Sequence, residues 1–314
     1  MKKCSIVVPV YFNELNLPKT IPRLLDLQEK LPDIELEIIF VDDGSGDKSL
    51  EILLDFQKKT PHIIKIVKLT RNFGALNAIH AGLSVASGDC VGAISADLQD
   101  PPELLVDMIK KWEQGNRAIF AIRKDRKDPL LSKIAAKIFY KLLRKFALPD
   151  YPPGGFDFFV IDRYIVEHIK TINEKNSSLM NLIFWLGFDY VAIPYVREKR
   201  QEGKSRWTFS KKIKLVIDSF IGFSYMPIKL LPILGSIFAL GSFIYGLMAI
   251  INWVNGKIPI EGWTTTIVIV TFIGGVQMIM LGVLGEYLWR TLDETRRRPP
   301  YIIDRIYHDK DSKL

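Results

Sequence analysis

Two carboxylates, Asp42 and Asp43, follow an apolar run at residues 37–41 and come just before a glycine-rich turn. A side chain at the end of a buried strand lies at the edge of a sheet where ligands bind, and glycines leave backbone N–H groups accessible there. This pattern suits the binding of a nucleoside base or a ribose. The alternative is a solvated acidic turn in which Asp47 caps the next helix.

Three oxygen-bearing side chains, Asp97, Gln99 and Asp100, follow a second apolar run at residues 90–95. Mg²⁺ and Mn²⁺ prefer oxygen ligands, and such an ion stabilises the negative charge that a departing diphosphate develops. Because two prolines follow Asp100, we expect this residue to be the N-cap of the next helix. The prediction of a metal site therefore rests on Asp97.

A further carboxylate, Asp157, stands among aromatic residues in the segment GGFDFF at residues 154–159. Aromatic neighbours would partly remove water from this carboxylate and raise its basicity, as a general base requires. The alternative is a purely structural carboxylate, because one Asp near glycines is a weak signal.

Three cations, Arg200, Lys204 and Arg206, come just before a segment that mixes lysines with apolar residues at residues 211–223. Their guanidinium and ammonium groups are suited to hold phosphates between a sheet and a membrane. Anchoring to lipid headgroups is the alternative.

The sequence lacks the signature motifs of several other classes of enzyme. The sequence contains no GxSxG, GxxxxGK[ST] or GxGxxG motif, which disfavours a hydrolase, a P-loop enzyme and a dehydrogenase. The four histidines show no metal-ligand spacing, and the two cysteines form no CxxC. The net charge is +8, and basic residues cluster beside the apolar runs near the end of the chain. Lipid headgroups or a phosphorylated substrate therefore fit this charge better than nucleic acid does.

The elements that must position these side chains alternate in type. Strands are predicted at residues 5–10, 37–41, 63–69 and 90–95, and helices at residues 17–30, 48–59 and 72–86. This alternation predicts an α/β fold with a mostly parallel sheet that helices cover on both faces. Ligands of such a sheet bind outside the carboxyl ends of its strands, which is where the polar clusters lie.

Two apolar runs, residues 230–254 and 263–285, contain no Asp, Glu, Lys or Arg. Each exceeds the roughly 20 helical residues that cross a hydrocarbon core of about 30 Å. The short link at residues 255–262 predicts an antiparallel hairpin, and basic residues on both outer flanks place both ends in the cytoplasm. Residues 205–229 are predicted to form amphipathic helices at the membrane interface, with an ordinary packed helix as the alternative.

Seven motifs in this order resemble the family 2 glycosyltransferases of GT-A fold, specifically the polyprenyl-phosphate glycosyltransferases that include dolichol-phosphate mannose synthase and the bacterial GtrB-like glucosyltransferases. They are VPVYFNE at residues 8–14, VDDGS at 41–45, RNFG at 71–74, SADLQDPPE at 95–103, the Asp157 segment, RQEGKSRW at 200–207, and GEY at 285–287 before RRRP at 296–299. The resemblance spans nearly the whole chain.

The resemblance implies a Rossmann-like GT-A catalytic domain, and the change in composition near residue 205 sets where that domain ends. We expect a cytoplasmic catalytic domain at residues 1–204, amphipathic juxtamembrane helices at 205–229, two transmembrane helices within 230–289, and a cytoplasmic basic tail at 290–314. This division predicts a multi-pass protein of a bacterial-type inner membrane.

The activity that the resemblance implies is transfer of a hexose, with glucose favoured, from a nucleotide diphosphate sugar to polyprenyl phosphate, with inversion at the anomeric carbon. UDP-hexose is favoured over GDP-hexose as donor, and the expected cofactor is Mg²⁺ or Mn²⁺. The motifs carry over a nucleoside site at Pro9, Tyr11, Glu14 and Asp43, a metal and diphosphate site at Asp97 and Gln99, and phosphate contacts at Arg123, Ser132, Arg200 and Lys204. Asp157 matches the carboxylate near the acceptor, where it acts as a base or orients a phosphate that is already largely ionised near pH 7.

Two positions depart from the family pattern. Many members carry Asp-Ala-Asp where this chain has Ser95, Ala96 and Asp97, so a hydroxyl replaces one carboxylate of the metal motif. The Ser95 oxygen could still bind the ion directly or through a water. Phe159 stands where other members carry Arg, so a phosphate contact is expected elsewhere.

Two alternative functions stay open. A processive polysaccharide synthase fits less well, because Gln201 and Arg206 do not have the spacing of a QxxRW motif and such an enzyme would carry more spans. A non-catalytic membrane partner that binds nucleotide sugar is motivated by Ser95. The sequence leaves homo-oligomerisation open and predicts no nucleic acid partner.

Overall fold

The structure is a computed structural model that describes the chain except for residues 126–129, 173, 175, 199–208, 256–261 and 309–314. The chain divides into two compact units. The first comprises Met1–Val216 and Pro299–Leu314, and the second comprises Ile217–Arg298. Each unit is described separately below.

The first unit alternates strands and helices, as the sequence predicts. Its elements are β1 (Lys2–Val10), α1 (Leu17–Leu25), α2 (Leu27–Lys30), β2 (Ile34–Asp42), α3 (Ser49–Lys59), β3 (Ile64–Leu69), α4 (Ala75–Val85), β4 (Cys90–Ala93), α5 (Leu104–Glu113), β5 (Ala118–Asp125), α6 (Leu130–Phe146), β6 (Phe158–Asp162), α7 (Arg163–Thr171), α8 (Leu179–Trp185), β7 (Tyr190–Val196) and, after the second unit, β8 (Ile303–Tyr307). Helix α9 (Phe209–Phe223) crosses the boundary between the units.

The strands form one mixed sheet in the order β7-β5-β6-β4-β1-β2-β3-β8. Its centre is parallel, because β1 pairs in parallel with both β2 and β4, and β2 pairs in parallel with β3. Strand β6 is antiparallel to both β4 and β5, and β5 is parallel to β7. The predicted α/β class with a mostly parallel sheet is therefore confirmed.

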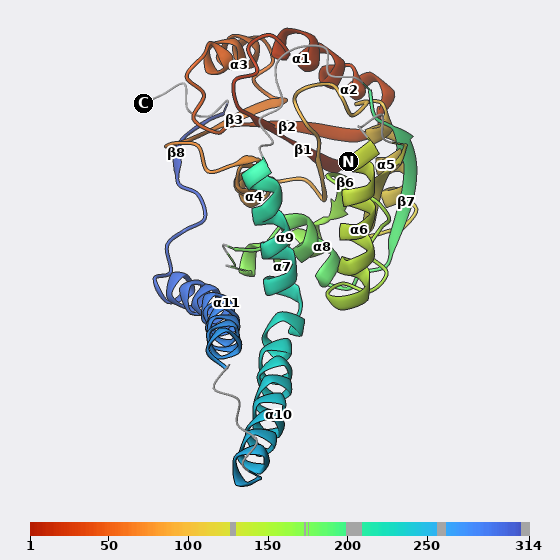
Figure 1. The fold of residues 1–314 in the computed structure, drawn as a ribbon. Coiled ribbons are helices and arrows are strands. Elements are labelled where there is room, and N and C mark those ends of the chain that lie inside the picture. The colour runs from red at the N-terminus through yellow and green to blue at the C-terminus, as the bar shows by residue number, and fades with distance from the viewer. Residues whose placement is uncertain (126–129, 173, 175, 199–208, 256–261, 309–314) are drawn as a thin grey trace. The chain divides into compact units, whose positions relative to one another are not determined.

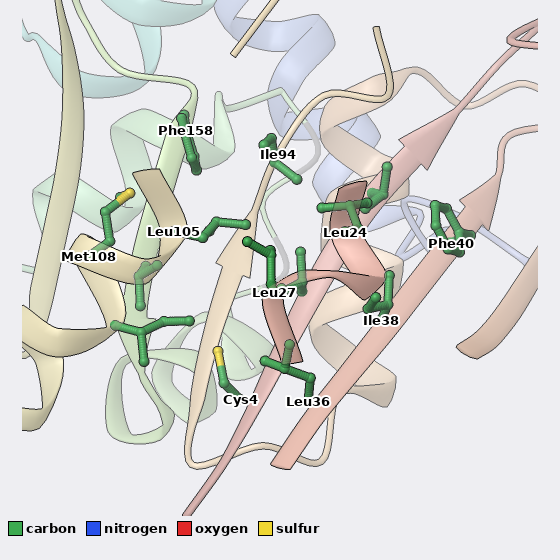
Figure 2. Packing of buried hydrophobic residues seen from close by; sticks show 14 of the residues in the cluster. Cys4, Leu24, Leu27, Leu36, Ile38, Phe40, Ile94, Leu105, Met108 and Phe158 are labelled. Carbon is green, nitrogen blue, oxygen red and sulfur yellow. The ribbon is translucent and has the colours of Figure 1, made fainter. Parts of the chain in front are cut away.

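Helices cover both faces of this sheet (Figure 1). On one face, the side chains of Ile6 and Val8 join an apolar cluster with residues of α1, α2, α3 and α5. Figure 2 shows this cluster, with Leu24 of α1, Leu27 of α2 and Leu105 of α5 among the labelled residues. The next side chain along β1, Val7, points to the opposite face, where α4 packs so closely that a Cβ on Gly82 would collide with it. The buried middle of each central strand is an apolar run, at residues 6–10 of β1 and 38–41 of β2, which explains why the sequence predicts these strands well.

The edge strand β8 comes after the second unit in sequence. It pairs antiparallel with β3, and Lys68 of β3 forms an ion pair with Asp304 of β8 at 2.6 Å. The sequence predicts a basic tail here and no strand, which is wrong for Ile303–Tyr307. Two adjacent charged residues interrupt the apolar residues of this short, half-exposed edge strand, so its apolar signal is weak.

The second unit contains the end of α9 and two long helices, α10 (Met226–Val254) and α11 (Trp263–Thr295). Within them, Met226–Met248 and Val268–Thr295 are apolar and long enough to cross a membrane, and almost none of their side chains are buried. A core helix of a soluble protein would be buried, so this exposure indicates membrane association, as the sequence predicts.

Contacts inside the second unit hold its helices together. The rings of Phe238 in α10 and Phe272 in α11 meet with centroids 5.6 Å apart. Arg290 of α11 forms ion pairs with Asp218 of α9 at 2.7 Å and with Glu286 one turn earlier at 2.9 Å. The two apolar helices thus contact each other, and a partly buried charge cluster attaches α9 to α11.

Candidate functional site

The topology brings the candidate residues to one edge of the sheet. The parallel strands β1, β2 and β4 end there, and β6 begins there because it is antiparallel to β4. Strands β5 and β7 also end there, with Arg123 opposite Tyr195. The predicted residues at this edge are Pro9 near the end of β1, Tyr11 and Glu14 after it, Asp43 after β2, Ser95, Asp97 and Gln99 after β4, Arg123 in β5 and Asp157 before β6.

The buried carboxylate of Asp43 holds the loop that precedes α4. It accepts hydrogen bonds from Phe73 N at 2.7 Å, from Gly74 N at 2.9 Å and from Asn72 Nδ2 at 2.9 Å. The loop comes so close to Gly44, whose φ is +71°, that an added Cβ would lie 2.8 Å from its backbone. Asp43 therefore shapes the end of β2, and its direct contact with a nucleoside stays a prediction.

The loop after β1 is braced by the loop after β2. Phe12 N donates to Ser45 Oγ at 3.1 Å, and Lys48 N donates to Glu14 Oε2 at 3.0 Å. The ring of Tyr11 meets Phe12 edge to face, with centroids 4.7 Å apart. Glu14 thus helps to hold the beginning of α3, and an aromatic pair stands beside the predicted nucleoside site.

Asp42, the last residue of β2, is a second buried carboxylate at this edge, with 1 % of its surface exposed. Its Oδ1 accepts a hydrogen bond from Ser45 N at 3.2 Å, whereas no donor among the described residues reaches its Oδ2. Burial raises the pKa of Asp42 above its ordinary value.

The predicted metal-binding segment follows β4 in a tight turn. Asp97 is 6 % exposed, and its Oδ1 accepts hydrogen bonds from Ser95 Oγ at 2.9 Å and from Gln99 N at 3.2 Å. Gln99 and Glu198 exchange two hydrogen bonds, at 2.9 and 3.3 Å, which tie this turn to the segment after β7. Ser95 therefore occupies the same side of the turn as Asp97, as a second oxygen ligand would.

This donor set fits a divalent cation only in part. Within the described residues, no group of three His, Cys, Asp or Glu side chains is arranged to enclose a metal ion. Mg²⁺ is usually held by one or two carboxylates together with substrate phosphates rather than by a cage of protein ligands. A site built from Asp97, with Ser95 beside it, fits a cation whose coordination a bound diphosphate completes.

The prediction that Asp100 is a helix N-cap is wrong. Helix α5 begins at Leu104 with Glu103 at the N-cap position. Pro101 precedes a second proline, which disfavours helical backbone at Pro101 and delays the helix. Asp100 instead turns inward and is 2 % exposed, and its two carboxylate oxygens contact the hydroxyls of Tyr195 at 2.5 Å and of Ser95 at 2.8 Å.

A chain of polar contacts continues from Asp100 to Asp157. Arg123 Nε donates to the Tyr195 hydroxyl at 3.3 Å, and Arg123 Nη2 donates to Asp157 Oδ2. Arg197 Nε lies 3.5 Å from Asp100 Oδ1, an ion-pair distance without hydrogen-bond geometry. Burial and the nearby Asp157 raise the pKa of Asp100. The turn predicted to bind a metal ion and the carboxylate of Asp157 are therefore connected through described side chains.

The structure corrects the predicted environment of Asp157. Its side chain is 48 % exposed and pairs with the largely buried guanidinium of Arg123, so aromatic neighbours do not desolvate it. The flanking rings of Phe156 and Phe158 point into the core instead, with 6 % and 0 % of their surfaces exposed. Asp157 is therefore an accessible carboxylate whose orientation is set by an arginine.

Three predicted phosphate-binding residues cannot be placed against this site. Arg200 and Lys204 lie outside the described residues, and Ser132 belongs to α6 although its side chain is not described. Among the described residues, sequence analysis missed Tyr195 and Arg197. A single tyrosine in an amphipathic strand matches no catalytic motif. The available signal is that both residues lie at the end of β7, the edge where the candidate site is found.

Comparisons with known proteins show which family this chain is similar to. The family model for glycosyl transferase family 2 matches residues 5–170. The chain is 37 % identical to the uncharacterized glycosyltransferase YkcC of Bacillus subtilis (strain 168), over 99 % of this chain and 96 % of that protein. It is 37 % identical to the bactoprenol glucosyl transferase of Shigella phage SfV, over 96 % of this chain and 98 % of that protein. A mannosyltransferase from Pyrobaculum calidifontis, solved with GDP-Man and Mn²⁺, shares the fold with a TM-score of 0.50 at 15 % identity, over 92 % of this chain and 87 % of that one.

Proposed function

The chain belongs to glycosyl transferase family 2 and is a glycosyltransferase, and from this premise we propose that it transfers glucose from a nucleotide diphosphate donor to polyprenyl phosphate with inversion. The main support for this proposal is that the similarity to a bactoprenol glucosyl transferase extends over nearly the whole chain. The family model stops at residue 170, whereas the match to a bactoprenol glucosyl transferase covers 96 % of the chain and therefore reaches into the apolar helices.

The donor side of the site is assigned to the ends of β1, β2 and β4. The aromatic pair of Tyr11 and Phe12 and the loop held by Asp43 offer a surface for the nucleoside. Asp97 would hold a divalent cation against the diphosphate, and when bound this ion stabilises the charge of the leaving group. UDP-glucose is the donor that we assign first.

The acceptor side is assigned to Asp157 and Arg123. An oxygen of the lipid phosphate attacks the anomeric carbon as the bond to the diphosphate breaks, and the bonding electrons leave with the diphosphate. The phosphate is already largely ionised near pH 7, so it needs positioning more than deprotonation. The Asp157 carboxylate is accessible and oriented by Arg123, and in this proposal it would orient the acceptor or take its last proton.

We assign the protein to a bacterial-type inner membrane as a two-span protein. The segments before and after the apolar helices both belong to the first unit, so a chain that crosses twice returns to the side where it began. Basic residues beside the spans favour the cytoplasmic side for that unit. Nucleotide sugars would then meet the site without crossing the membrane.

The test is transfer of radiolabelled sugar into organic-extractable lipid by the purified full chain with undecaprenyl phosphate and Mg²⁺ or Mn²⁺. A panel of UDP and GDP sugars serves as donors, and we expect label from UDP-glucose. Reactions without the lipid phosphate are the control for donor hydrolysis. Bound nucleotide with no lipid label from any donor would contradict the proposed reaction and favour a non-catalytic partner.

A further inference from the structure

Arg197 brings an unused hydrogen-bond donor to the candidate site. It comes directly after β7, which ends at the edge of the sheet where the candidate residues lie. Its side chain is 30 % exposed, and its Nε atom is buried without a hydrogen-bond partner among the described residues. A buried N–H group without a partner is uncommon in folded proteins, because it costs free energy. The guanidinium of Arg197 is therefore suited to receive a ligand.

The contact between Arg197 and Asp100 depends on charge alone. Arg197 Nε lies 3.5 Å from Asp100 Oδ1, and the pair lacks hydrogen-bond geometry. The two carboxylate oxygens of Asp100 already contact the hydroxyls of Tyr195, at 2.5 Å, and of Ser95, at 2.8 Å. Asp100 would keep both of these contacts if the guanidinium of Arg197 turned toward another anion.

A second guanidinium at this edge, that of Arg123, already has partners. Its Nε donates to the Tyr195 hydroxyl at 3.3 Å, and its Nη2 donates to Asp157 Oδ2. A guanidinium that is hydrogen-bonded to a carboxylate has fewer donors left for a substrate phosphate. Of these two arginines, Arg197 therefore has the greater capacity to bind an incoming anion.

The backbone beside Arg197 is attached to the turn predicted to bind a metal ion. Glu198 N donates to Gln99 O at 2.9 Å, and Gln99 Nε2 donates to Glu198 O at 3.3 Å. Asp97 belongs to the same turn, where its Oδ1 accepts a hydrogen bond from Gln99 N at 3.2 Å. Arg197 thus stands one residue from the hydrogen bonds that hold the turn in which Asp97 would meet a donor diphosphate.

We propose that Arg197 binds the diphosphate of the sugar donor, and that Asp100 holds its guanidinium at the site until the donor arrives. The planar fork of a guanidinium matches two phosphate oxygens, and such charge-assisted hydrogen bonds are strong. When the bond to the sugar breaks, the diphosphate takes the bonding electrons, and the same contact stabilises its added negative charge. This inference rests on the proposed function, whose donor is a nucleotide diphosphate sugar.

Binding of radiolabelled UDP to the purified full chain in detergent, with Mg²⁺ and without a lipid acceptor, tests this assignment. We expect Arg197→Gln to weaken UDP binding by at least about tenfold, as the loss of a hydrogen bond between charged partners usually does. The matched control is Arg117→Gln, which removes an exposed guanidinium just before β5, at the other end of that strand. Arg117 lies over the ring of Tyr164 there, so the control should bind UDP as the wild type does.

A second pair of variants separates phosphate binding from neutralisation of Asp100. In Asp100→Asn no buried charge remains for Arg197 to neutralise, and the amide can still bond to the hydroxyls of Tyr195 and Ser95. This background also avoids the buried, unpaired charge that Arg197→Gln alone would leave. We expect Arg197→Gln to weaken UDP binding by about tenfold here as well. Equal UDP affinities with and without Arg197→Gln in this background would overturn the proposal, because Arg197 would then act only on Asp100.

Kinetics distinguish the donor diphosphate from the acceptor phosphate. If Arg197→Gln left UDP binding unchanged but raised the KM for undecaprenyl phosphate by about tenfold, the assignment to the donor would be wrong. Chains that bind UDP but transfer no sugar would contradict the proposed reaction and leave the binding comparison intact. GDP is titrated beside UDP, and a wild-type chain that binds neither would contradict both the proposed donor and this inference.

Discussion

At the scale of single residues, Asp97 is the carboxylate that we propose to hold the cation and the donor diphosphate. We predict that Asp97→Asn lowers sugar transfer by at least about 100-fold, because a bound cation contributes several kcal/mol of charge stabilisation to such a reaction. The amide oxygen of Asn can still accept the hydrogen bonds that Ser95 Oγ and Gln99 N make to Oδ1. Circular dichroism of the variant should therefore match the wild type, and turnover close to the wild-type rate would contradict the assignment.

The hydroxyl of Tyr195 is a positioning group between Asp100 and Arg123. We predict that Tyr195→Phe lowers kcat by about tenfold with little change in the KM for the donor, since Arg123 would lose a partner that fixes how it meets Asp157. Steady-state kinetics with separate titrations of donor and acceptor measure this split. The matched control is Tyr190→Phe on the same strand. Within the described part of the chain, the Tyr190 hydroxyl donates a hydrogen bond only to the backbone oxygen of Asp150, at 3.3 Å.

Equal losses in the two tyrosine variants would contradict a special role for Tyr195. Loss of stability is a separate matter, because removing a buried hydrogen-bond partner costs about 1–3 kcal/mol whatever the catalytic role. Thermal unfolding of both variants, measured beside the kinetics, separates that cost from an effect on kcat.

The sequence predicts those site residues that directly follow an apolar strand and misses those that do not. Asp43 and Asp97 follow apolar runs, so strand periodicity alone places them at the binding edge. Asp100 was assigned to a helix cap because its neighbours in sequence suggested one, whereas its partner Tyr195 lies 95 positions away in the chain. Contacts across such separations are set by the antiparallel insertion of β6, which no local pattern encodes.

At the scale of elements, the carboxylate of Glu37 joins three strands. Lys65 of β3 pairs with it at 2.5 Å, Ser5 of β1 donates to it at 2.5 Å, and Ser87 N donates at 2.9 Å. Burial opposes the charge of Glu37, but these donors outweigh burial and lower its pKa from 4.5 to about 2. The contact is almost wholly buried, since 3 % of the Glu37 side chain is exposed.

This shift predicts an acid-sensitive contribution to stability. Since the folded-state pKa of Glu37 lies below the unfolded value, the contribution is complete above about pH 4.5 and is lost as pH falls toward 2. The shift corresponds to about 3 kcal/mol of unfolding free energy. Denaturant titrations of the full chain in detergent at several pH values measure it. In Glu37→Gln we expect a loss of about 3–5 kcal/mol near pH 7 and a flatter dependence on acid.

An unchanged acid dependence in Glu37→Gln would contradict this origin. The matched control is Glu35→Gln on the same strand, whose partner Lys3 lies at 2.9 Å while 55 % of the Glu35 side chain is exposed. Such an exposed pair contributes little, so the control should keep the wild-type stability and its acid dependence.

At the scale of the whole molecule, the first unit, which contains the candidate site and is called the catalytic unit below, is discontinuous in sequence. The apolar helices interrupt it, and the chain returns to add β8 to the sheet. Hydropathy predicts the two long helices because their signal is local. Hydropathy does not predict that the chain adds β8 to the sheet after the apolar helices. Strand β8 is short and half-exposed, and it pairs with a strand more than 200 residues earlier. A truncation before the helices would therefore remove part of the catalytic sheet as well.

This topology predicts that the segment after the spans stabilises the catalytic unit. A chain that ends at Arg298 keeps both apolar helices but loses β8, the Lys68–Asp304 ion pair and the contact between His80 and Tyr301. We expect it to reach the membrane and to lose about 2 kcal/mol or more of unfolding free energy, because β3 becomes an unpaired edge and apolar surface is exposed. The matched control ends at His308, after β8. Thermal unfolding of both chains in detergent measures the difference, and equal melting temperatures would show that the catalytic unit is complete without its returning strand.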